Sequence, residues 1–209
     1  MLVNVFLLKV NEFKGGELLS QLPEADQKQI AAAANEKRKS ELTFGRTLLR
    51  KSLNYLNNPL SEREVTVDST GKPFIKNCYE FSISHSKDFV ALAVSADQSV
   101  GIDIQFKDAS RDIDEIVKSY ASDEEQEFFN SLEPQDKLNW FYKSWAAIEA
   151  AAKVNGAGIA NFDRSFVDLN NVIAINAEYF LAISGKTKIK ELGVFKFLPS
   201  FEFSPIHFA

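Results

Sequence analysis

Residues 137–154 read KLNWFYKSWAAIEAAAKV, and this stretch decides the fold. Its alanines and other strong helix formers predict the best-defined helix of the chain. Gly156 follows closely, and glycine is the residue expected just past a helix end. Trp145, Glu149 and Lys153 recur every four residues, so we expect them along one face of this helix.

Glu149 and Lys153 have two interpretations. A Glu–Lys pair four residues apart on a solvent-exposed face is common and contributes about 0.2–0.5 kcal/mol. The alanines on every side of the pair instead indicate a helix packed against its neighbours. A carboxylate inside a packed helix needs a reason, such as a bound metal ion or a proton-transfer role.

Outward from this helix, the chain alternates strands with shorter helices. Apolar or alternating segments predict strands at 1–9, 65–67, 81–84, 89–95, 100–105, 171–176, 179–183 and 193–198. Helices are expected from Pro23 towards Tyr55 with one break, at 112–120, and at 123–132 behind a capping box that begins at Ser122. Each half combines a long helix with a small, mostly antiparallel sheet. This pattern predicts an α+β fold of two similar halves, residues 1–105 and 106–209.

The strand at 100–105 carries a candidate metal site. Side chains alternate along a strand, so Asp103 and Gln105 share the face opposite to Ile102 and Ile104. A carboxylate beside an amide oxygen is a donor set for a hard cation such as Mg²⁺. A half-buried strand with two exposed polar residues is the alternative, and this segment alone favours it.

Two other segments are candidates for binding phosphate. Ser84 and His85 lie at the end of the predicted strand FSISHS, residues 81–86. A serine hydrolase is one interpretation, but the Gly-x-Ser-x-Gly pattern of a nucleophile elbow is missing. A hydrogen-bonding clamp on a phosphate fits these residues better, and a polar strand end fits equally well. Lys72 follows Gly71 on a predicted turn, from which an ammonium group can reach a phosphate.

The composition excludes several classes of protein. The 209 residues are 45% hydrophobic and 25% charged, which is ordinary for a globular protein. A net charge of −5 argues against general nucleic-acid binding, although residues 36–51 carry six basic side chains against two acidic ones. The single cysteine, Cys78, and the lack of any apolar run near 20 residues predict a cytoplasmic protein without a membrane span.

Taken in order, these segments resemble the 4′-phosphopantetheinyl transferase family, in its surfactin-type subgroup with two halves in one chain. The resemblance covers residues 45–158 and depends on the order and spacing of five short motifs. They are GRTLL at 45–49, GKP at 71–73, SISHS at 82–86, GIDI at 101–104, and the helix from Trp145 to Lys153 followed by GAG at 156–158.

The resemblance implies an enzyme with its active site in the cleft between the halves. It would transfer the 4′-phosphopantetheine arm of coenzyme A to a serine of an apo acyl or peptidyl carrier protein and release 3′,5′-ADP. Asp103, Gln105 and Glu149 would hold Mg²⁺ or Mn²⁺. Glu149, directly or through water, would help to remove the proton from the acceptor serine, and Lys153 would neutralise charge on the pyrophosphate as 3′,5′-ADP leaves.

The same resemblance divides the substrates between the halves. Arg46, Lys72, Ser84 and His85 would bind the 3′-phosphate and adenosine part of coenzyme A, in the first half. The second half would supply the catalytic helix and the surface for the carrier protein. Because one chain supplies both sides of the cleft, a monomer is expected.

Three departures from the usual family pattern each remove a charge. Gln105 stands where many relatives have glutamate, Ile148 where they commonly have lysine, and Ala157 where many have lysine. The first change leaves Asp103 and Glu149 as the carboxylates available to the metal. A degenerate module that binds coenzyme A or a carrier protein without transfer is therefore the alternative to an active enzyme.

Overall fold

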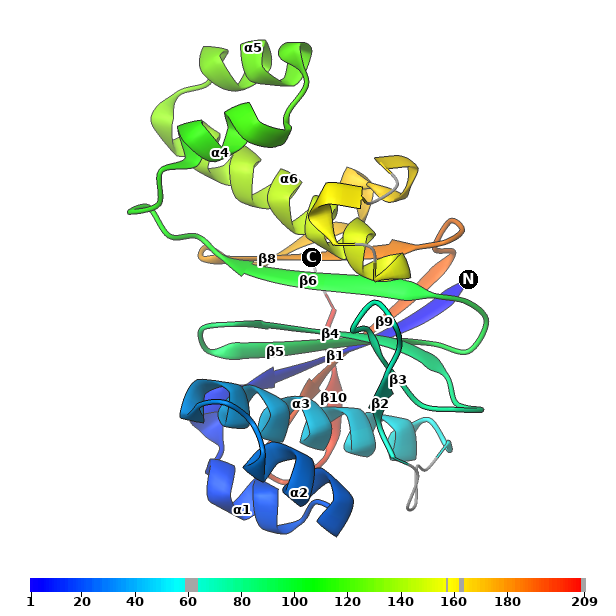
Figure 1. Cartoon of the computed structure of the whole chain (residues 1–209). Helices are drawn as coiled ribbons and strands as arrows, with labels where there is room; N and C mark the ends of the chain where they lie inside the picture. Colours follow the sequence, from blue (N-terminus) through cyan, green and yellow to red (C-terminus); the bar gives the residue numbers. More distant parts are fainter. Residues whose placement is uncertain (59–63, 157, 162–163, 208–209) are drawn as a thin grey trace.

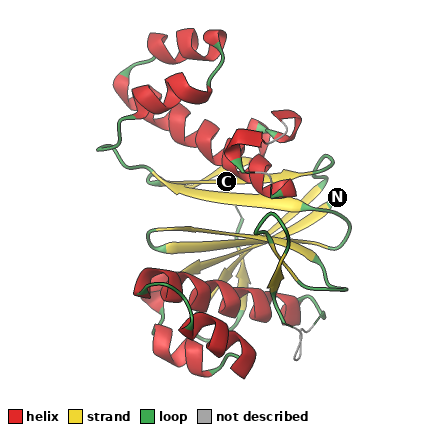
Figure 2. Ribbon diagram, in the orientation of Figure 1, coloured by secondary structure: helices red, strands yellow, loops and turns green. Residues whose placement is uncertain are grey.

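The computed structural model describes residues 1–58, 64–156, 158–161 and 164–207. Two β-sheets lie in the middle of the molecule, with helices covering the outer face of each (Figures 1 and 2). Within the described residues, no helix is long and apolar enough to cross a membrane.

The first layer of helices packs on a five-stranded sheet. The sheet has the strand order β10-β9-β1-β5-β4. Its strands are β1 (Leu2–Lys9), β4 (Glu80–Ser86), β5 (Phe89–Ser95), β9 (Glu191–Phe197) and β10 (Phe203–Pro205). The helices are α1 (Gly15–Ser20), α2 (Glu24–Ala31) and α3 (Glu36–Tyr55). Asn35 begins α3 by accepting a hydrogen bond from the Arg38 amide, and Leu48 and Leu53 of α3 pack against Phe6 and Leu92 of the sheet.

The second layer packs on a three-stranded sheet with the order β6-β8-β7. Its strands are β6 (Val100–Phe106), β7 (Val172–Asn176) and β8 (Tyr179–Gly185), and its helices are α4 (Ile113–Tyr120), α5 (Asp123–Ser131) and α6 (Pro134–Asn155). The capping box at Ser122 and Glu125 begins α5 as predicted. Four short 3₁₀ turns and a small hairpin complete the described elements: Val10–Glu12, Ile159–Asn161, Arg164–Phe166, Leu169–Asn171, β2 (Thr66–Val67) and β3 (Pro73–Phe74).

The two sheets share one core, and the ends of the chain meet in the first sheet. Val5 of β1, Ala93 of β5, Ile102 of β6 and Leu181 of β8 belong to one buried cluster. Strand β1 pairs with β9 in parallel, whereas the other strand pairs are antiparallel. The strand predicted at 193–198 therefore extends the first sheet instead of the second, because β1 supplies the edge on which it pairs.

The predicted α+β class is confirmed, and the predicted strands and helices all occur with small shifts in their ends. The sequence analysis missed α1, β3 and β10, which are six residues or fewer. The predicted division into halves at residues 1–105 and 106–209 stays a prediction. Strands β9 and β10 belong to the second half in sequence but pair in the first sheet.

Close packing of α6 on the second sheet positions the candidate site. Ala146, Ala147 and Ala150 of α6 are fully buried against Ala182 of β8. A Cβ atom added to Gly101 of β6 would lie 1.9 Å from the Ala150 carbonyl oxygen, so only glycine permits this approach. The small residues bring the helix backbone close to β6, and the longer side chains of α6 reach past it.

Candidate active site

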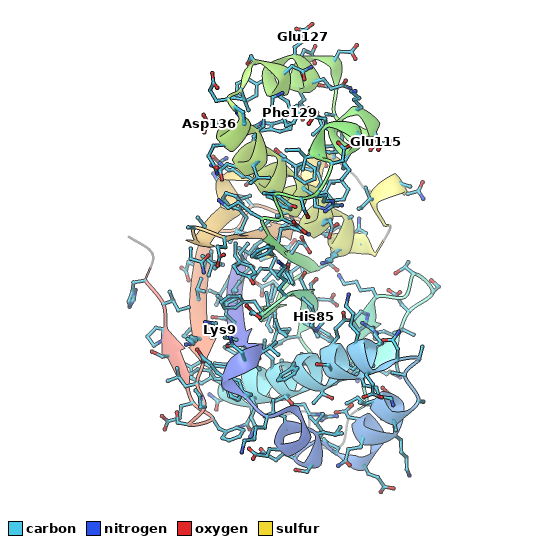
Figure 3. The ribbon with its side chains drawn as sticks, turned by 90° about the vertical axis from the view of Figure 1, so that its left-hand side faces the viewer. Lys9, His85, Glu115, Glu127, Phe129 and Asp136 are labelled. Carbon is cyan, nitrogen blue, oxygen red and sulfur yellow. The ribbon has the colours of Figure 1, made fainter. Side chains whose placement is uncertain are left out.

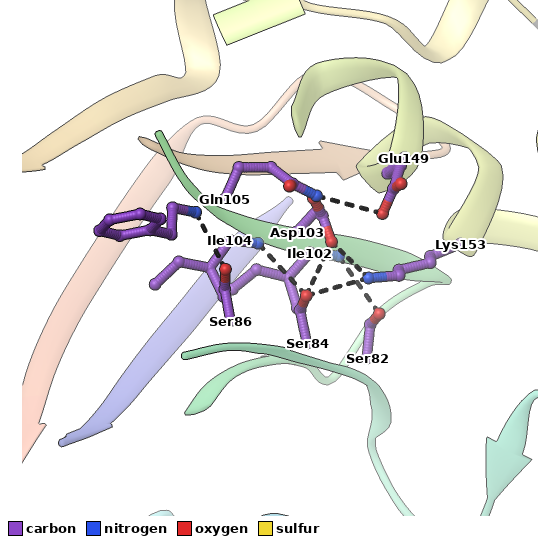
Figure 4. A network of polar contacts seen from close by, with 10 residues as sticks. Ser82, Ser84, Ser86, Ile102, Asp103, Ile104, Gln105, Glu149 and Lys153 are labelled. Carbon is purple, nitrogen blue, oxygen red and sulfur yellow. Dashed lines mark hydrogen bonds and ion pairs between the residues drawn. The ribbon is translucent and has the colours of Figure 1, made fainter. Parts of the chain in front are cut away.

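Asp103 lies at the centre of a polar network between α6, β4 and β6 (Figure 4). The residue is 1% exposed. Its Oδ1 accepts hydrogen bonds from Ser84 Oγ at 2.7 Å and from Lys153 Nζ at 2.5 Å. Its Oδ2 accepts one from the Gln105 amide nitrogen at 2.6 Å. One cation and two neutral donors therefore compensate this buried charge.

Glu149 projects from α6 towards the same network. The Gln105 amide nitrogen lies 3.4 Å from Glu149 Oε2, and the indole N–H of Trp145, one turn earlier, donates to the Glu149 carboxylate. Burial, and then the negative charge of Asp103, raise the pKa of Glu149 to about 7, although Lys153 acts in the opposite direction. A carboxyl group with such a pKa can gain or lose a proton near neutral pH.

These side chains fit a divalent cation. Two carboxylates meet at the Gln105 amide, and a half-turn of that amide presents its oxygen at the same point. Mg²⁺ is commonly bound by one or two protein carboxylates together with substrate phosphates and water. Among the described residues, no cluster of three or more His, Cys, Asp or Glu side chains could hold a metal. A cation at this point would also relieve the repulsion between Asp103 and Glu149.

Lys72 lies beside the network at the end of α6. Its Nζ donates to the carbonyl oxygens of Val154, at 2.6 Å, and Val100, at 3.3 Å. One N–H donor of Lys72 therefore ties the β2–β3 turn to the end of α6, where Gly156 adopts a positive φ of 67°, and a second ties it to the start of β6. Burial lowers the pKa of Lys72. Lys72, Glu149 and Lys153 line one pocket of about 360 Å³.

His85 lies on the other side of β4, beside α3 (Figure 3). Its Nε2 is 2.9 Å from the Glu41 carbonyl oxygen. Because a carbonyl oxygen can only accept, Nε2 donates this hydrogen bond, and Nδ1 is the unprotonated ring nitrogen in the neutral form. Burial lowers the pKa of His85. With Lys37 and Lys87 it lines a second pocket, of about 510 Å³.

Arg46 is engaged within the first helical layer. It is 8% exposed, its Nε lies 3.7 Å from Asp26 Oδ1, and it donates to Gln29 Oε1 at 3.1 Å. Arg50 also pairs with Asp26. Burial lowers the pKa of Arg46, while Asp26 acts in the opposite direction. The structure thus brings together Asp103, Gln105, Glu149, Lys153 and Ser84, with Lys72 adjacent, and places Arg46 and His85 outside this contact network.

The geometry argues against a serine hydrolase built on Ser84 and His85. Adjacent residues of a strand point to opposite faces, and the Ser84 hydroxyl contacts Asp103 and Lys153 while His85 contacts Glu41 on α3. Ser84 and His85 therefore do not form a nucleophile–base pair.

Four positions were missed in the sequence analysis or were considered there without their surroundings. Ser82 and Ser86 each accept a hydrogen bond from the β6 backbone, and the alternation of three serines in β4 was the available signal. Ile148 is 5% exposed, so the position where the family resemblance leads us to expect lysine is buried here. Ala157, the third departure, lies outside the described residues.

Two family models match consecutive parts of the chain and together include the residues of this acidic site. A model of the 4′-phosphopantetheinyl transferase N-terminal domain matches residues 25–95, and a model of the 4′-phosphopantetheinyl transferase superfamily matches residues 99–191. The chain belongs to the 4′-phosphopantetheinyl transferase family.

Named relatives agree with this assignment. The chain is 32% identical over 157 residues to the 4′-phosphopantetheinyl transferase AcpT of Salmonella typhimurium, covering 73% of each protein. It is 29% identical over 127 residues to the 4′-phosphopantetheinyl transferase HetI of Nostoc sp. PCC 7120, covering 58% of this chain and 54% of HetI. It is 29% identical over 143 residues to the 4′-phosphopantetheinyl transferase gsp of Aneurinibacillus migulanus, covering 68% of this chain and 59% of the relative. The matches to HetI and gsp thus span little more than half of each relative's length.

Proposed function

We propose that this protein transfers the 4′-phosphopantetheine arm of coenzyme A to a serine of an apo acyl or peptidyl carrier protein and releases 3′,5′-ADP. The observation that carries the proposal is the convergence of Asp103, Glu149 and Lys153 beside the Gln105 amide, in a chain that belongs to this family. The names of the relatives AcpT and HetI, each a 4′-phosphopantetheinyl transferase, support the proposal.

Asp103 and Glu149, with the amide oxygen of Gln105, would hold Mg²⁺ or Mn²⁺. The ion would supply charge neutralisation on the pyrophosphate of coenzyme A. Since Gln105 brings no charge, these two carboxylates provide the negative charge of the donor set. The Gln105 amide nitrogen contacts both the Asp103 and the Glu149 carboxylates, which supports a shared ligand role for the three side chains.

The residues of α6 would act on the proton and the leaving group. The carrier serine oxygen forms a bond to the β-phosphorus of coenzyme A, and the bond from that phosphorus to 3′,5′-ADP breaks. The serine proton passes to Glu149, directly or through water, as in general-base catalysis. Lys153 neutralises charge on the departing 3′,5′-ADP, so positioning and electrostatics carry the reaction.

The four residues assigned to coenzyme A by resemblance divide into two pairs. Lys72 retains one N–H donor beside the pocket that contains Glu149 and Lys153. His85 shares its pocket with Lys37 and Lys87. We assign a direct phosphate contact to Lys72. Neutral His85 has only an acceptor nitrogen left, so we assign it to the adenosine part of coenzyme A, with Lys37 and Lys87 of its pocket available to a phosphate. Arg46 and Ser84 are already bound to protein groups, and we assign them to shaping the site.

Mass spectrometry of an apo carrier protein tests the function. Incubation with this protein, coenzyme A and Mg²⁺ should add the mass of one phosphopantetheine arm. Asp103→Ala and Glu149→Ala should each abolish the gain, whereas Glu127→Ala, at an exposed position in the middle of α5 far from His85 (Figure 3), should leave it intact. No mass gain with any of several acyl and peptidyl carriers would refute the proposal.

A non-catalytic binding module is the second candidate, because Gln105 removes a charge and Lys153 already pairs with Asp103. Coenzyme A binding without turnover, unaffected by Mg²⁺, would favour it. Gain of activity in Gln105→Glu would identify the missing charge as the cause.

We further assign the protein to the surfactin-type subgroup, to the cytoplasm and to a monomeric state. Both family regions lie in one chain, and gsp aligns with 68% of it. A sequence with Cys78 as its single cysteine, and a coenzyme A substrate, suit a reducing compartment. Sedimentation of the purified protein tests the monomer.

A further inference from the structure

The two sheets meet at their edges through serine side chains. Strand β4 is the last strand of the first sheet, and β6 is the first strand of the second. Three β4 hydroxyls accept hydrogen bonds from alternate backbone amides of β6 (Figure 4). The pairs are Ser82 Oγ with Ile102 N at 3.2 Å, Ser84 Oγ with Ile104 N at 3.3 Å, and Ser86 Oγ with Phe106 N at 2.9 Å. We call these three residues the serine ladder.

The ladder satisfies an edge that would otherwise lack partners. An edge strand presents a row of N–H groups to whatever lies beside it, and a buried N–H without a partner costs about 1–3 kcal/mol. Ser82 and Ser84 are 5% and 4% exposed, so water has little access to the first two amides. Side chains replace the backbone carbonyls of a neighbouring strand here, and the two sheets therefore stay separate instead of joining into one.

The middle rung has additional partners. Ser84 Oγ donates to Asp103 Oδ1 at 2.7 Å and accepts from Lys153 Nζ at 3.1 Å. The hydroxyls of Ser82 and Ser86 have no such contact with the acidic network among the described hydrogen bonds. Ser84 thus connects β4 and β6 to α6 through one oxygen atom.

We propose that the serine ladder is a positioning device, which sets the register of β6 against β4 and, through Ser84, orients Asp103 and Lys153 towards Glu149. Ser84 is a positioning residue in this scheme, since it acts through Asp103. This inference rests on the proposed function for its effect on catalysis, and on the hydrogen bonds alone for its effect on β6.

Hydrogen exchange of the β6 amides tests the register. Ser82→Ala, Ser84→Ala and Ser86→Ala should each speed exchange at the matching amide, Ile102, Ile104 or Phe106, by about tenfold or more relative to the other two. Ser184→Ala is the matched control, because the Ser184 hydroxyl is buried on β8 and has no hydrogen-bond partner among the residues that the structure describes. It should change none of the three rates. Unchanged exchange at the matching amides in all three variants would overturn the ladder.

Kinetics and metal binding test the middle rung. Ser84→Ala should lower kcat about tenfold to a hundredfold with KM for coenzyme A within about threefold, because orientation is lost and not binding. Ser82→Ala and Ser86→Ala should stay within about threefold of the wild type. Ser84→Thr, which keeps the hydroxyl, should recover most of the activity.

Titration with Mn²⁺ alone, followed by electron paramagnetic resonance, gives a readout that does not need turnover. Ser84→Ala should bind Mn²⁺ about tenfold more weakly, as expected when a partner of a metal-binding carboxylate is removed, and Ser86→Ala should not. Equal losses in all three ladder variants, or no change in Ser84→Ala, would overturn the role of Ser84. A wild-type protein without transferase activity would refute the proposed function, while the exchange and Mn²⁺ results would still decide the ladder.

Discussion

The two long helices, α3 and α6, occupy matching places in the fold but differ in whether their charged side chains are paired with opposite charges. Each packs on one sheet and each buries polar residues. On α3, Arg46 and Arg50 are paired with the buried carboxylate of Asp26 from the neighbouring α2. On α6, Glu149 faces another carboxylate, Asp103, and its pKa rises. Compensated charge on α3 stabilises the fold, whereas the like-charged pair at α6 is where we propose that a cation binds.

Removal of Asp26 should have the largest effect on stability. Asp26→Ala leaves two nearly buried guanidinium groups without this carboxylate, which should cost about 3–5 kcal/mol in the free energy of unfolding. Urea denaturation measures it. Glu24→Ala, on the same helix, removes an exposed pair with Lys28 and should change stability by less than about 1 kcal/mol. Similar losses in both variants would show that charge on α3 is not specifically compensated.

Gly101→Ala should have the second largest effect on stability, through the packing of α6 on β6. The new Cβ would meet the Ala150 carbonyl oxygen, a backbone atom that cannot move alone, so a loss of about 1–3 kcal/mol is expected. Transfer activity should fall further, since α6 carries Glu149 and Lys153. Gly16→Ala, where nothing lies within 4 Å of the added atom, should be neutral or stabilising. Retention of full stability and activity in Gly101→Ala would contradict the close packing of α6.

Stability of the metal-free protein should depend on pH through Glu149. Its pKa rises from an ordinary 4.5 to about 7, so the folded protein binds more protons than the unfolded chain between these values. The contribution of this group is therefore fully present below pH 4.5 and is lost as pH rises through about 7. Glu149→Gln removes that dependence. Thermal unfolding in a chelator should show Glu149→Gln gaining stability over the wild type from pH 5 to pH 8, and parallel curves would refute the raised pKa.

Gly45→Ala, on α3, should have the smallest effect on the free energy of unfolding. The added Cβ would lie 3.2 Å from His85 Nε2, a side-chain atom, while alanine improves helix propensity by about 1 kcal/mol. The two effects should nearly cancel in the free energy of unfolding. Because His85 must shift, we expect KM for coenzyme A to rise a few fold. An unchanged KM would argue against a coenzyme A contact by His85.

Local sequence patterns were sufficient for much of the fold. The residues 137–154 and the capping box at Ser122 predicted α6 and α5, and alternation predicted β4 and β6. The same alternation placed Asp103 and Gln105 on one face, and the four-residue spacing placed Trp145, Glu149 and Lys153 on another. Each of these depends on residues within one or two turns, whose geometry the backbone repeats.

Long-range contacts decided the rest. The parallel pairing of β1 with β9 joins residues about 190 positions apart, and no local pattern specifies it. Two side-chain contacts also depend on which elements pack together. They are the ion pair of Arg46 with Asp26, between α3 and α2, and the hydrogen bond of Ser84 with Asp103, between β4 and β6.

The sequence by itself determined which residues could carry charge and which face of each element they would share. Only the tertiary structure decided which of those charges are neutralised, because compensation depends on distance and burial between elements and not on spacing along one of them. For Glu149 these contacts make the difference between a surface ion pair and a half-buried carboxyl group with a raised pKa.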